Sequence, residues 1–186
     1  MKIYQNLNNQ NLISQIKANA IGVMPTDTIY GLVGSALDTN VVEKIYQVRK
    51  RNPKKPMIIL IGKISDLKLF DVNIKGETAK ILSKFWPGPV SIILPCRNQQ
   101  YNYLHRGTKS LAFRLPAKTD LIKLLRKTGP LVAPSANIEG ESPAENIEQV
   151  KKYFGTNIDF YVDGGDIKGQ PSELITVENN KIQILR

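Results

Sequence analysis

The side chains best suited to chemistry in this sequence are cations crowded into one segment and hydroxyls gathered in short runs. The segment "RKRNPKK", Arg49 to Lys55, carries five cations in seven residues. The runs "PTDT" at 25–28 and "PSAN" at 134–137 directly follow apolar segments. Cations bind phosphates and carboxylates, and hydroxyls hydrogen-bond small polar ligands. The pattern is typical of a site that holds anions, although charge runs are also commonly solvated helix ends, and hydroxyl runs also form turns and caps.

Candidates for covalent or zinc chemistry are few. The chain has one cysteine, Cys96, and one histidine, His105. Together they give neither a disulfide framework nor a zinc-binding spacing. Cys96 follows the apolar run "IILP", so a buried thiol is expected rather than a nucleophile. His105 lies in the polar stretch "NYLHRGTK", where a surface role and a functional role both stay open.

The sequence lacks the usual phosphate-binding loops. The stretch "GGDIKGQ" has two glycines at the spacing of a Walker A loop, but Gln170 stands where the lysine belongs. No GxGxxG fingerprint occurs either. A bound nucleotide would therefore have to be held by cationic side chains. Asp27, Asp163 and Asp166 are candidates for binding magnesium, with turn or helix-cap roles as the alternative.

The elements that position these residues alternate along the chain. Apolar spacing of three and four residues predicts helices at about 10–20, 39–51, 76–86, 119–128 and 144–154. Short β-rich runs lie between them, at 22–24, 57–62, 90–95, 111–116, 130–135 and 159–164. An antiparallel hairpin is expected over 173–186, around an Asn-Asn turn at 179–180. The pattern predicts one α/β domain, residues 1–186, with a mixed sheet and a ligand crevice beyond the strand ends.

Length and composition are those of a soluble globular protein. The 186 residues are 41% hydrophobic and 23% charged, which suits a single domain with a substantial core. Lys and Arg total 26 against 16 Asp and Glu, and the net charge of +10 predicts a polyanionic partner. No apolar run approaches the ~18 residues of a membrane span, and the N-terminus lacks an apolar signal core. A cytoplasmic protein without membrane contact is expected.

Six motifs, spread from residue 21 to about 176, carry a family resemblance. In chain order they are "PTDTIYGL", "RKRNPKKPM", "FWPGPV", "SLAFRLP", "APSAN" and "DGGDIKGQPS". In this order they resemble the YrdC-like family, the threonylcarbamoyl-AMP synthases, and the length is similar to its single-domain form. The resemblance implies a YrdC-like α/β fold, with a twisted mixed parallel and antiparallel sheet and flanking helices.

The resemblance also implies a reaction and its participants. L-Threonine, bicarbonate and ATP, with Mg2+, give threonylcarbamoyl-adenylate and pyrophosphate, so the enzyme is an L-threonylcarbamoyladenylate synthase, a nucleotidyltransferase. Partner proteins that modify tRNA then accept the adenylate and form N6-threonylcarbamoyladenosine (t6A) at position 37. No protein nucleophile is needed, because the protein has only to hold two anions together and stabilise charge at the phosphorus.

The nucleotide side of the site follows from the resemblance position by position. The Lys-x-Arg pair of the family falls on Arg49 and Arg51, so an arginine replaces its lysine. The Ser-x-Asn pair falls on Ser135 and Asn137. These two pairs are implied to be catalytic, and Arg51 and Ser135 to bind ATP as well. Further positions that match ATP contacts are Lys55 and Ser110.

The L-threonine side is carried over in the same way. Thr28 in "PTDT", Arg114 in "FRLP" and Ser172 in "QPSE" match positions that touch the amino acid. Arg114 lies in an apolar strand, where its guanidinium needs an anion. That anion is a threonine carboxylate or, as the alternative, a nearby Asp or Glu. Many relatives have a histidine where this chain has Leu60, so one polar contact to the amino acid is missing here.

Two other functions stay open. A basic surface would also suit an RNA-binding module, although no RRM signature or KH-type GxxG clamp occurs. The second is carbamoyl-adenylate chemistry on another acceptor, because similar domains occur in carbamoyl transferases that mature hydrogenases. Threonine-dependent release of pyrophosphate would separate the synthase from both alternatives.

Overall fold

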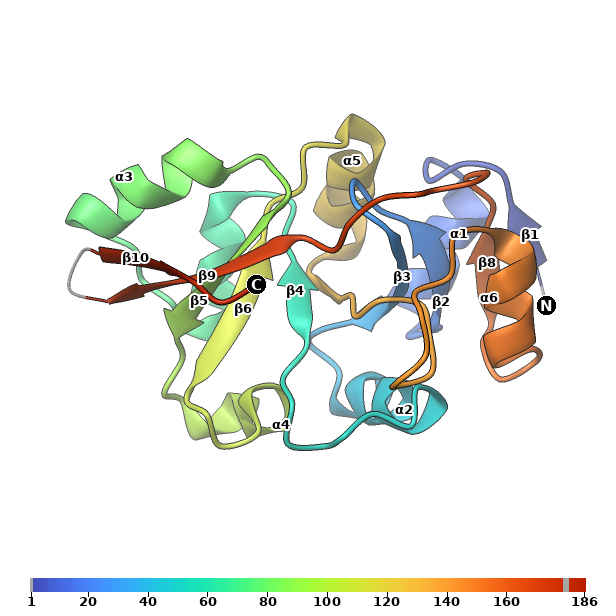
Figure 1. Cartoon of the computed structure of the whole chain (residues 1–186), viewed down its shortest axis with the longest axis horizontal. Coiled ribbons are helices and arrows are strands. Elements are labelled where there is room, and N and C mark those ends of the chain that lie inside the picture. Colours follow the sequence, from blue (N-terminus) through green and yellow to red (C-terminus); the bar gives the residue numbers. More distant parts are fainter. Residues whose placement is uncertain (1, 179–180) are drawn as a thin grey trace.

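The computed structural model describes residues 2–178 and 181–186 (Figure 1). Its strands are β1 (Lys2–Tyr4), β2 (Gly22–Pro25), β3 (Tyr30–Ser35), β4 (Ile58–Leu60), β5 (Val90–Pro95), β6 (Ser110–Arg114), β7 (Leu131–Val132), β8 (Phe160–Val162), β9 (Glu173–Glu178) and β10 (Lys181–Ile184). Its helices are α1 (Gln10–Lys17), α2 (Thr39–Val48), α3 (Gly76–Phe85), α4 (Asn102–His105), α5 (Thr119–Thr128) and α6 (Ile147–Phe154), with 3-10 turns at Ile64–Phe70 and Gln99–Tyr101. Helices and strands alternate along most of the chain, which confirms the α/β class.

The described strands form one mixed sheet. Their order across the sheet is β1-β8-β2-β3-β7-β4-β6-β5-β9-β10. The sheet contains parallel pairs, such as β4 with β6 and β5 with β9, and antiparallel pairs, such as β2 with β3 and β5 with β6. Because strands that are neighbours in the sheet come from distant parts of the sequence, loops that are far apart in the chain meet over one face.

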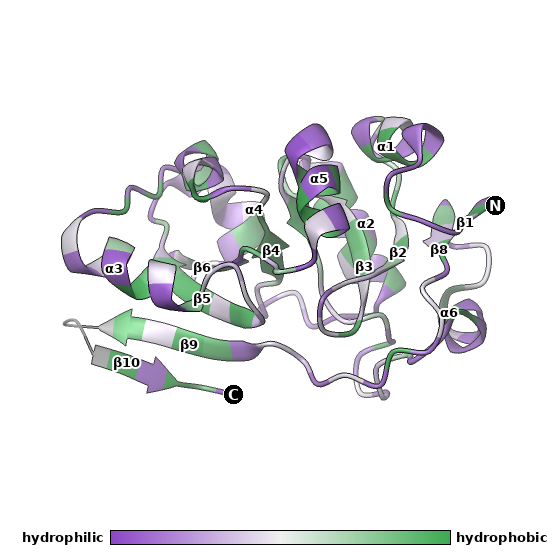
Figure 2. Ribbon diagram, turned by 90° about the horizontal axis from the view of Figure 1, so that it is seen from above, coloured by the Kyte–Doolittle hydropathy of each residue, from purple (hydrophilic) through white to green (hydrophobic). Residues whose placement is uncertain are grey.

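Two apolar clusters cover different faces of the sheet. The smaller cluster joins α1 and α5 to strand residues such as Met24 and Leu60. The larger cluster contains the preceding residues of the same strands, Val23 and Ile59, together with α2 and α6. Residues that are adjacent along a strand point to opposite faces. Figure 2 accordingly shows α1 and α5 on one side of the sheet and α6 on the other.

The polar run "PTDT" belongs to a tight hairpin between β2 and β3. The strands pair antiparallel from Gly22 opposite Val33 to Pro25 opposite Tyr30. The sequence pattern predicts β2 but not β3, whose sequence "YGLVGS" contains two glycines and does not alternate. Its side chains are buried almost throughout, so the period-2 signal of a half-buried strand is absent.

The other elements follow the sequence closely. The five predicted helices are confirmed as α1, α2, α3, α5 and α6, with ends shifted by up to three residues. Strands β9 and β10 pair antiparallel as expected, and the predicted Asn-Asn turn at 179–180 lies outside the described residues. The prediction missed β1, a three-residue strand, and the short helix α4. In the part of the chain that the structure describes, no helix has the length and apolar character needed to cross a membrane.

Candidate functional site

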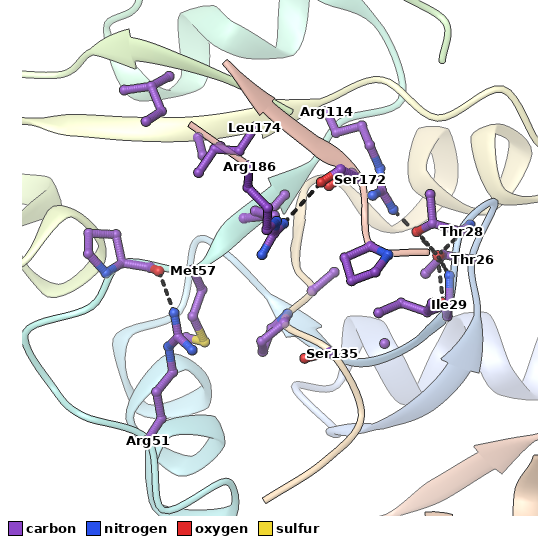
Figure 3. Close-up of a pocket in the computed structure, with 18 of the residues that line it drawn as sticks. Thr26, Thr28, Ile29, Arg51, Met57, Arg114, Ser135, Ser172, Leu174 and Arg186 are labelled. Carbon is purple, nitrogen blue, oxygen red and sulfur yellow. Dashed lines mark hydrogen bonds between the residues drawn. The ribbon is translucent and has the colours of Figure 1, made fainter. Parts of the chain in front are cut away.

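A cavity of about 330 Å³ opens over the middle of the sheet and gathers most of the predicted site residues (Figure 3). Its walls come from the β2–β3 turn, the segment after α2, strands β4, β5, β6 and β9, the loop after β7, and Arg186. The predicted residues that line it are Thr28, Arg49, Arg51, Ser110, Arg114, Ser135 and Ser172. Lys55 and Asn137 are not part of this wall.

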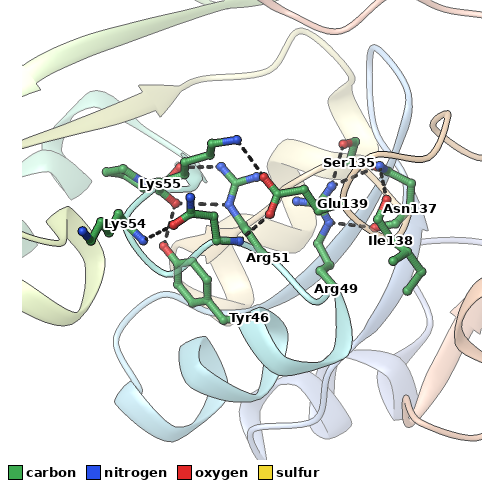
Figure 4. Close-up of polar contacts among 11 residues, drawn as sticks. Tyr46, Arg49, Arg51, Lys54, Lys55, Ser135, Asn137, Ile138 and Glu139 are labelled. Carbon is green, nitrogen blue, oxygen red and sulfur yellow. Dashed lines mark hydrogen bonds and ion pairs between the residues drawn. The ribbon is translucent and has the colours of Figure 1, made fainter.

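Arg49 follows the last residue of α2 and ties that helix to the loop after β7. Its Nε donates to Asn137 O at 2.9 Å, and its Nη2 donates to Asn137 Oδ1 at 2.9 Å and to Ser135 Oγ at 3.2 Å (Figure 4). Burial, together with the nearby charge of Arg51, lowers the pKa of Arg49 to about 10. The guanidinium is therefore charged at neutral pH. Its Nη1 is buried and has no hydrogen-bond partner among the described residues.

Asn137 supports Arg49 from behind the cavity wall. The side chain is buried, and its Nδ2 donates to Ile138 O and Glu141 O, both at 2.8 Å. These bonds fix the amide so that Oδ1 faces Arg49. In this structure Asn137 positions the cation rather than the cavity contents.

Arg51 lines the cavity from a loop that folds back on itself. Its Nε donates to Lys55 O at 3.1 Å, and its Nη2 donates to Pro56 O at 2.8 Å. Tyr46, at the buried side of α2, donates its hydroxyl to Lys55 O at 2.9 Å. The loop therefore orients the Arg51 guanidinium before any ligand arrives.

Lys55 is held away from the cavity by an acidic residue. Its Nζ lies 2.9 Å from Glu139 Oε1. The other carboxylate oxygen of Glu139 accepts a hydrogen bond from the backbone N–H of Asn52 (Figure 4). Glu139 thus forms an ion pair with Lys55 and accepts a hydrogen bond from the backbone of Asn52.

Arg114 ends β6 and is paired with Asp27 of the β2–β3 turn. Its Nη2 lies 3.1 Å from Asp27 Oδ1 and donates to Thr26 Oγ1 at 3.4 Å. Asp27 Oδ2 accepts from the N–H of Ala117 at 3.1 Å. Burial lowers the pKa of Arg114, and the Asp27 charge opposes that shift. Asp27 is thus the nearby acidic residue expected from the sequence as the alternative partner of Arg114. The Nε of Arg114 is buried and has no hydrogen-bond partner in the described ranges.

Hydroxyl groups complete the cavity wall near Arg114. Thr28 Oγ1 lies 3.1 Å from Thr26 Oγ1, so the turn presents two hydroxyls together. Ser172 Oγ lies 2.8 Å from Ser91 Oγ, and both side chains are buried. Ser110 is half-buried at the other end of β6 from Arg114. The wall can therefore hydrogen-bond a small polar ligand at several points.

Sequence reasoning missed two residues of this region, Arg186 and Glu139. Arg186 lines the cavity, and its Nη2 donates to Ser172 O at 3.1 Å. The only sequence signal for it is a cation that follows the apolar strand β10, a pattern that is common on surfaces. Glu139 carries no signal, because its partners lie more than 80 residues away along the chain.

The remaining candidates from the sequence lie outside the cavity wall. Cys96 is buried as predicted. His105 is fully buried, so its surface alternative is wrong, and its Nδ1 accepts from the N–H of Gly107 at 3.1 Å. Asp163 accepts from a backbone N–H two residues ahead, which is a turn role, and Asp166 accepts from the side chain of Asn146, the N-cap of α6. Within residues 2–178 and 181–186 no group of three or more His, Cys, Asp or Glu side chains could hold a metal.

The segment between β8 and β9 passes very close to the β2–β3 turn. Tyr30 donates its hydroxyl to Gly165 O and accepts from the N–H of Gly164, both at 2.8 Å. Further along, a Cβ added to Gly169 would lie 2.0 Å from the carbonyl oxygen of Thr28. Only glycine allows this approach without moving one of the two backbones.

Replacing Gly169 with alanine is therefore expected to lower the free energy of unfolding by about 1–3 kcal/mol, the usual cost of overpacking. Urea unfolding of the purified variant measures this loss. Lys168→Ala, at an exposed neighbouring position, is the control and should leave stability unchanged. A Gly169→Ala variant as stable as the wild type would show that the two backbones are not in contact.

The pairing of Glu139 predicts how stability depends on pH. The hydrogen bond from Lys55, followed by that from the Asn52 N–H, lowers the pKa of the Glu139 carboxyl below its ordinary value of 4.5. A carboxylate with a lowered pKa in the folded state stabilises the fold above the unfolded-state pKa, and this contribution is lost as pH falls through the folded-state pKa. The stability difference between wild type and Glu139→Gln should thus stay constant from pH 7 to about 5 and shrink only at lower pH. Urea unfolding across pH 3–7 tests this, and a difference that has already vanished at pH 5.5 would contradict it.

Comparison with known families gives a match over most of the chain. A model of the Sua5–YciO–YrdC family, described as "Telomere recombination", matches residues 14–186. The threonylcarbamoyl-AMP synthase of Pyrococcus abyssi is 32% identical over 154 residues, which are 82% of this chain and 45% of that protein. The one from Idiomarina loihiensis is 30% identical over 175 residues, which are 91% of this chain and 92% of that protein. The chain spans less than half the length of the first two curated relatives it matches.

Solved structures agree with this match. The crystal structure of P. abyssi Sua5 complexed with L-threonine has a TM-score of 0.90 at 28% identity, covering 100% of this chain and 57% of that one. Escherichia coli YciO has a TM-score of 0.84 at 19% identity, covering 100% of this chain and 93% of the other. The YrdC-like fold expected from the sequence is thereby confirmed.

Proposed function

The chain belongs to the Sua5–YciO–YrdC family, and on that premise we propose that it is an L-threonylcarbamoyladenylate synthase. It combines L-threonine, bicarbonate and ATP into threonylcarbamoyl-adenylate, pyrophosphate and water, which makes it a nucleotidyltransferase. The complex of the P. abyssi relative with L-threonine supports the choice of amino acid. The adenylate then supplies the threonylcarbamoyl group of t6A in tRNA.

The observation that carries this proposal is one cavity with cations in two parts of its wall. Arg49 and Arg51 enter from the end of α2, and Arg114 enters beside the β2–β3 turn. Two anionic ligands can therefore be held side by side, a polyphosphate at one part and a carboxylate at the other. A cavity of about 330 Å³ is of the size that small-molecule sites have.

The chemistry follows from this division of the wall. The threonine amine attacks the carbon of bicarbonate or of carbon dioxide, and the resulting carbamate oxygen attacks the α-phosphorus while the bond to the β-phosphate breaks. We assign Arg114, Thr28 and Ser172 to the threonine carboxylate and hydroxyl. We assign Arg49 and Arg51 to the phosphates, where they stabilise the charge that builds up on pyrophosphate. The protein contributes proximity and electrostatics, and neither step needs a protein nucleophile.

The other participants are part of the same proposal. Magnesium is taken to enter with ATP, as the counter-ion of its phosphates. Ser110 and Ser135 are assigned to nucleotide contacts, because both line the same cavity as Arg51. The adenylate is labile, so tRNA-modifying partner proteins are needed to accept it and transfer its threonylcarbamoyl group.

The test is amino-acid-dependent release of pyrophosphate. The purified protein is incubated with labelled bicarbonate, ATP, magnesium and one amino acid at a time. Threonine should give pyrophosphate and a labelled adenylate in equal amounts, whereas valine, which lacks the hydroxyl, should give at least about 10²-fold less. Release that is independent of threonine, or equal with valine, would contradict the proposal.

A further inference from the structure

Glu139 makes contacts that reach across the whole cationic loop. Its backbone N–H donates to Arg49 O at 2.9 Å, at the start of that loop. One carboxylate oxygen accepts from the N–H of Asn52, and the other lies 2.9 Å from Lys55 Nζ. A single residue thus contacts the beginning, the middle and the end of the segment Arg49–Lys55 (Figure 4).

This loop needs an outside anchor because of its own charge. The segment Arg49–Lys55 holds five cations and no acid, and like charges at such spacing repel one another. Lys50 also adopts a left-handed backbone conformation, with φ of 50°, which a lysine rarely adopts unless its surroundings impose it. The Arg51 guanidinium is oriented by the carbonyls of Lys55 and of Pro56, the residue that follows the loop, so its place in the cavity wall depends on the loop staying closed.

The carboxylate of Glu139 lies outside the cavity wall. Glu139 is not among the residues that line the cavity, whereas Arg49 and Arg51 are. Both of its oxygens are occupied by donors of the loop, and the Lys55 ammonium neutralises its charge locally. The arrangement therefore suits support of the loop better than competition with phosphates for its cations.

We propose that Glu139 is a positioning residue for the nucleotide phosphates: it anchors the loop Arg49–Lys55 so that Arg49 and Arg51 face the cavity. This inference rests on the proposed function, because it takes the anion at this part of the wall to be ATP. An acidic residue thus contributes indirectly to the binding of an anionic substrate.

The experiment compares two acidic residues of the segment between β7 and α6. Glu139→Gln removes one charge and keeps the side-chain volume, and Glu139→Ala removes the contacts altogether. Glu141→Gln is the matched control, since Glu141 is exposed and its carboxylate has no hydrogen bond or ion pair within the described part of the chain. The KM for ATP should rise about tenfold in Glu139→Gln and more in Glu139→Ala, while the KM for threonine stays within about twofold. Glu141→Gln should match the wild type in both.

Direct titration with adenosine, AMP and magnesium-ATP separates positioning from a general structural role. If Glu139 positions Arg49 and Arg51 for the phosphates, Glu139→Gln should lose more affinity for ligands that carry more phosphates. Its affinity for adenosine, which has none, should be nearly unchanged. Tighter ATP binding by Glu139→Gln than by Glu141→Gln would mean that the carboxylate competes with phosphate. Equal losses for all three ligands would mean that Glu139 only stabilises the fold. Either result overturns the inference, while a wild type that binds no ATP overturns the proposed function as well.

Discussion

Replacing Arg49 with alanine is expected to lower the rate of threonylcarbamoyl-adenylate formation about 10³-fold, equivalent to about 4 kcal/mol of transition-state stabilisation. The variant loses a buried cation of the cavity wall together with three hydrogen bonds that hold Ser135 and Asn137. Losing these bonds should also lower the free energy of unfolding by about 2–4 kcal/mol, because Asn137 is left with unpaired oxygens. Pyrophosphate release measures the rate, and urea unfolding measures stability.

Two further variants test whether the loss of rate in Arg49→Ala is due to the Arg49 side chain itself. Arg49→Lys keeps the charge but not the planar fork, so its rate should stay within about tenfold of the wild type. Lys50→Ala removes the neighbouring cation, which is exposed, and should change the rate by less than about twofold. If Arg49→Ala were as active as Lys50→Ala, the cationic segment would be a solvated surface and not part of the site.

Replacing Arg114 with glutamine is expected to weaken threonine binding at least about 10²-fold, or about 2.7 kcal/mol, and to leave ATP binding nearly unchanged. The guanidinium is the cation beside the hydroxyls of Thr26 and Thr28, and a threonine carboxylate can accept from its remaining donors. Calorimetric titration of each ligand in the absence of the other measures both affinities. Weaker ATP binding with intact threonine binding would mean that the cavity is divided the other way round.

Arg114 forms an ion pair with Asp27, so Arg114→Gln affects stability as well as binding. Variants of Asp27 provide the control for the effect on stability. Arg114→Gln leaves the Asp27 carboxylate buried without its cation, which by itself destabilises the fold. The double variant Asp27→Asn/Arg114→Gln removes both charges and should recover stability without recovering threonine binding. Asp27→Asn alone keeps the cation and an oxygen for the Ala117 N–H, so threonine affinity should fall less than tenfold. Recovery of threonine binding in the double variant would show that Arg114 acts only through the fold.

Local sequence was sufficient for most of the fold and for several of the segments that form the site, although not for Arg186. Apolar periodicity predicts the main helices, since these are amphipathic elements with one buried face. The hydroxyl and cation runs identify the turn at Thr28 and the helix end at Arg49. Strand β3 escaped prediction because it is buried on both faces, and a pattern of alternation exists only where one face meets water.

The pairings inside the site could not be predicted from the sequence. Asp27 meets Arg114, and Lys55 meets Glu139, across more than 80 residues in each case. Sequence periodicity does not relate positions this far apart. Taken alone, Asp27 and Glu139 look like ordinary turn or surface residues. The cations of these pairs can therefore be identified in the sequence. The carboxylate that pairs with each of them depends on the order of the strands in the sheet.

The cavity wall runs from Thr26 to Arg186 along the chain, and this has a consequence for how the protein folds. Its strands are paired by long-range contacts, and closing such loops makes folding slow compared with that of helical bundles. A chain that has not yet placed β9 beside β5 lacks Ser172 and Leu174 in the cavity wall, so a form without this strand pair has an incomplete site. Ligands should therefore stabilise the folded state by mass action, raising the free energy of unfolding by about 2.7 kcal/mol at a ligand concentration a hundred times the dissociation constant. The melting temperature should rise with it.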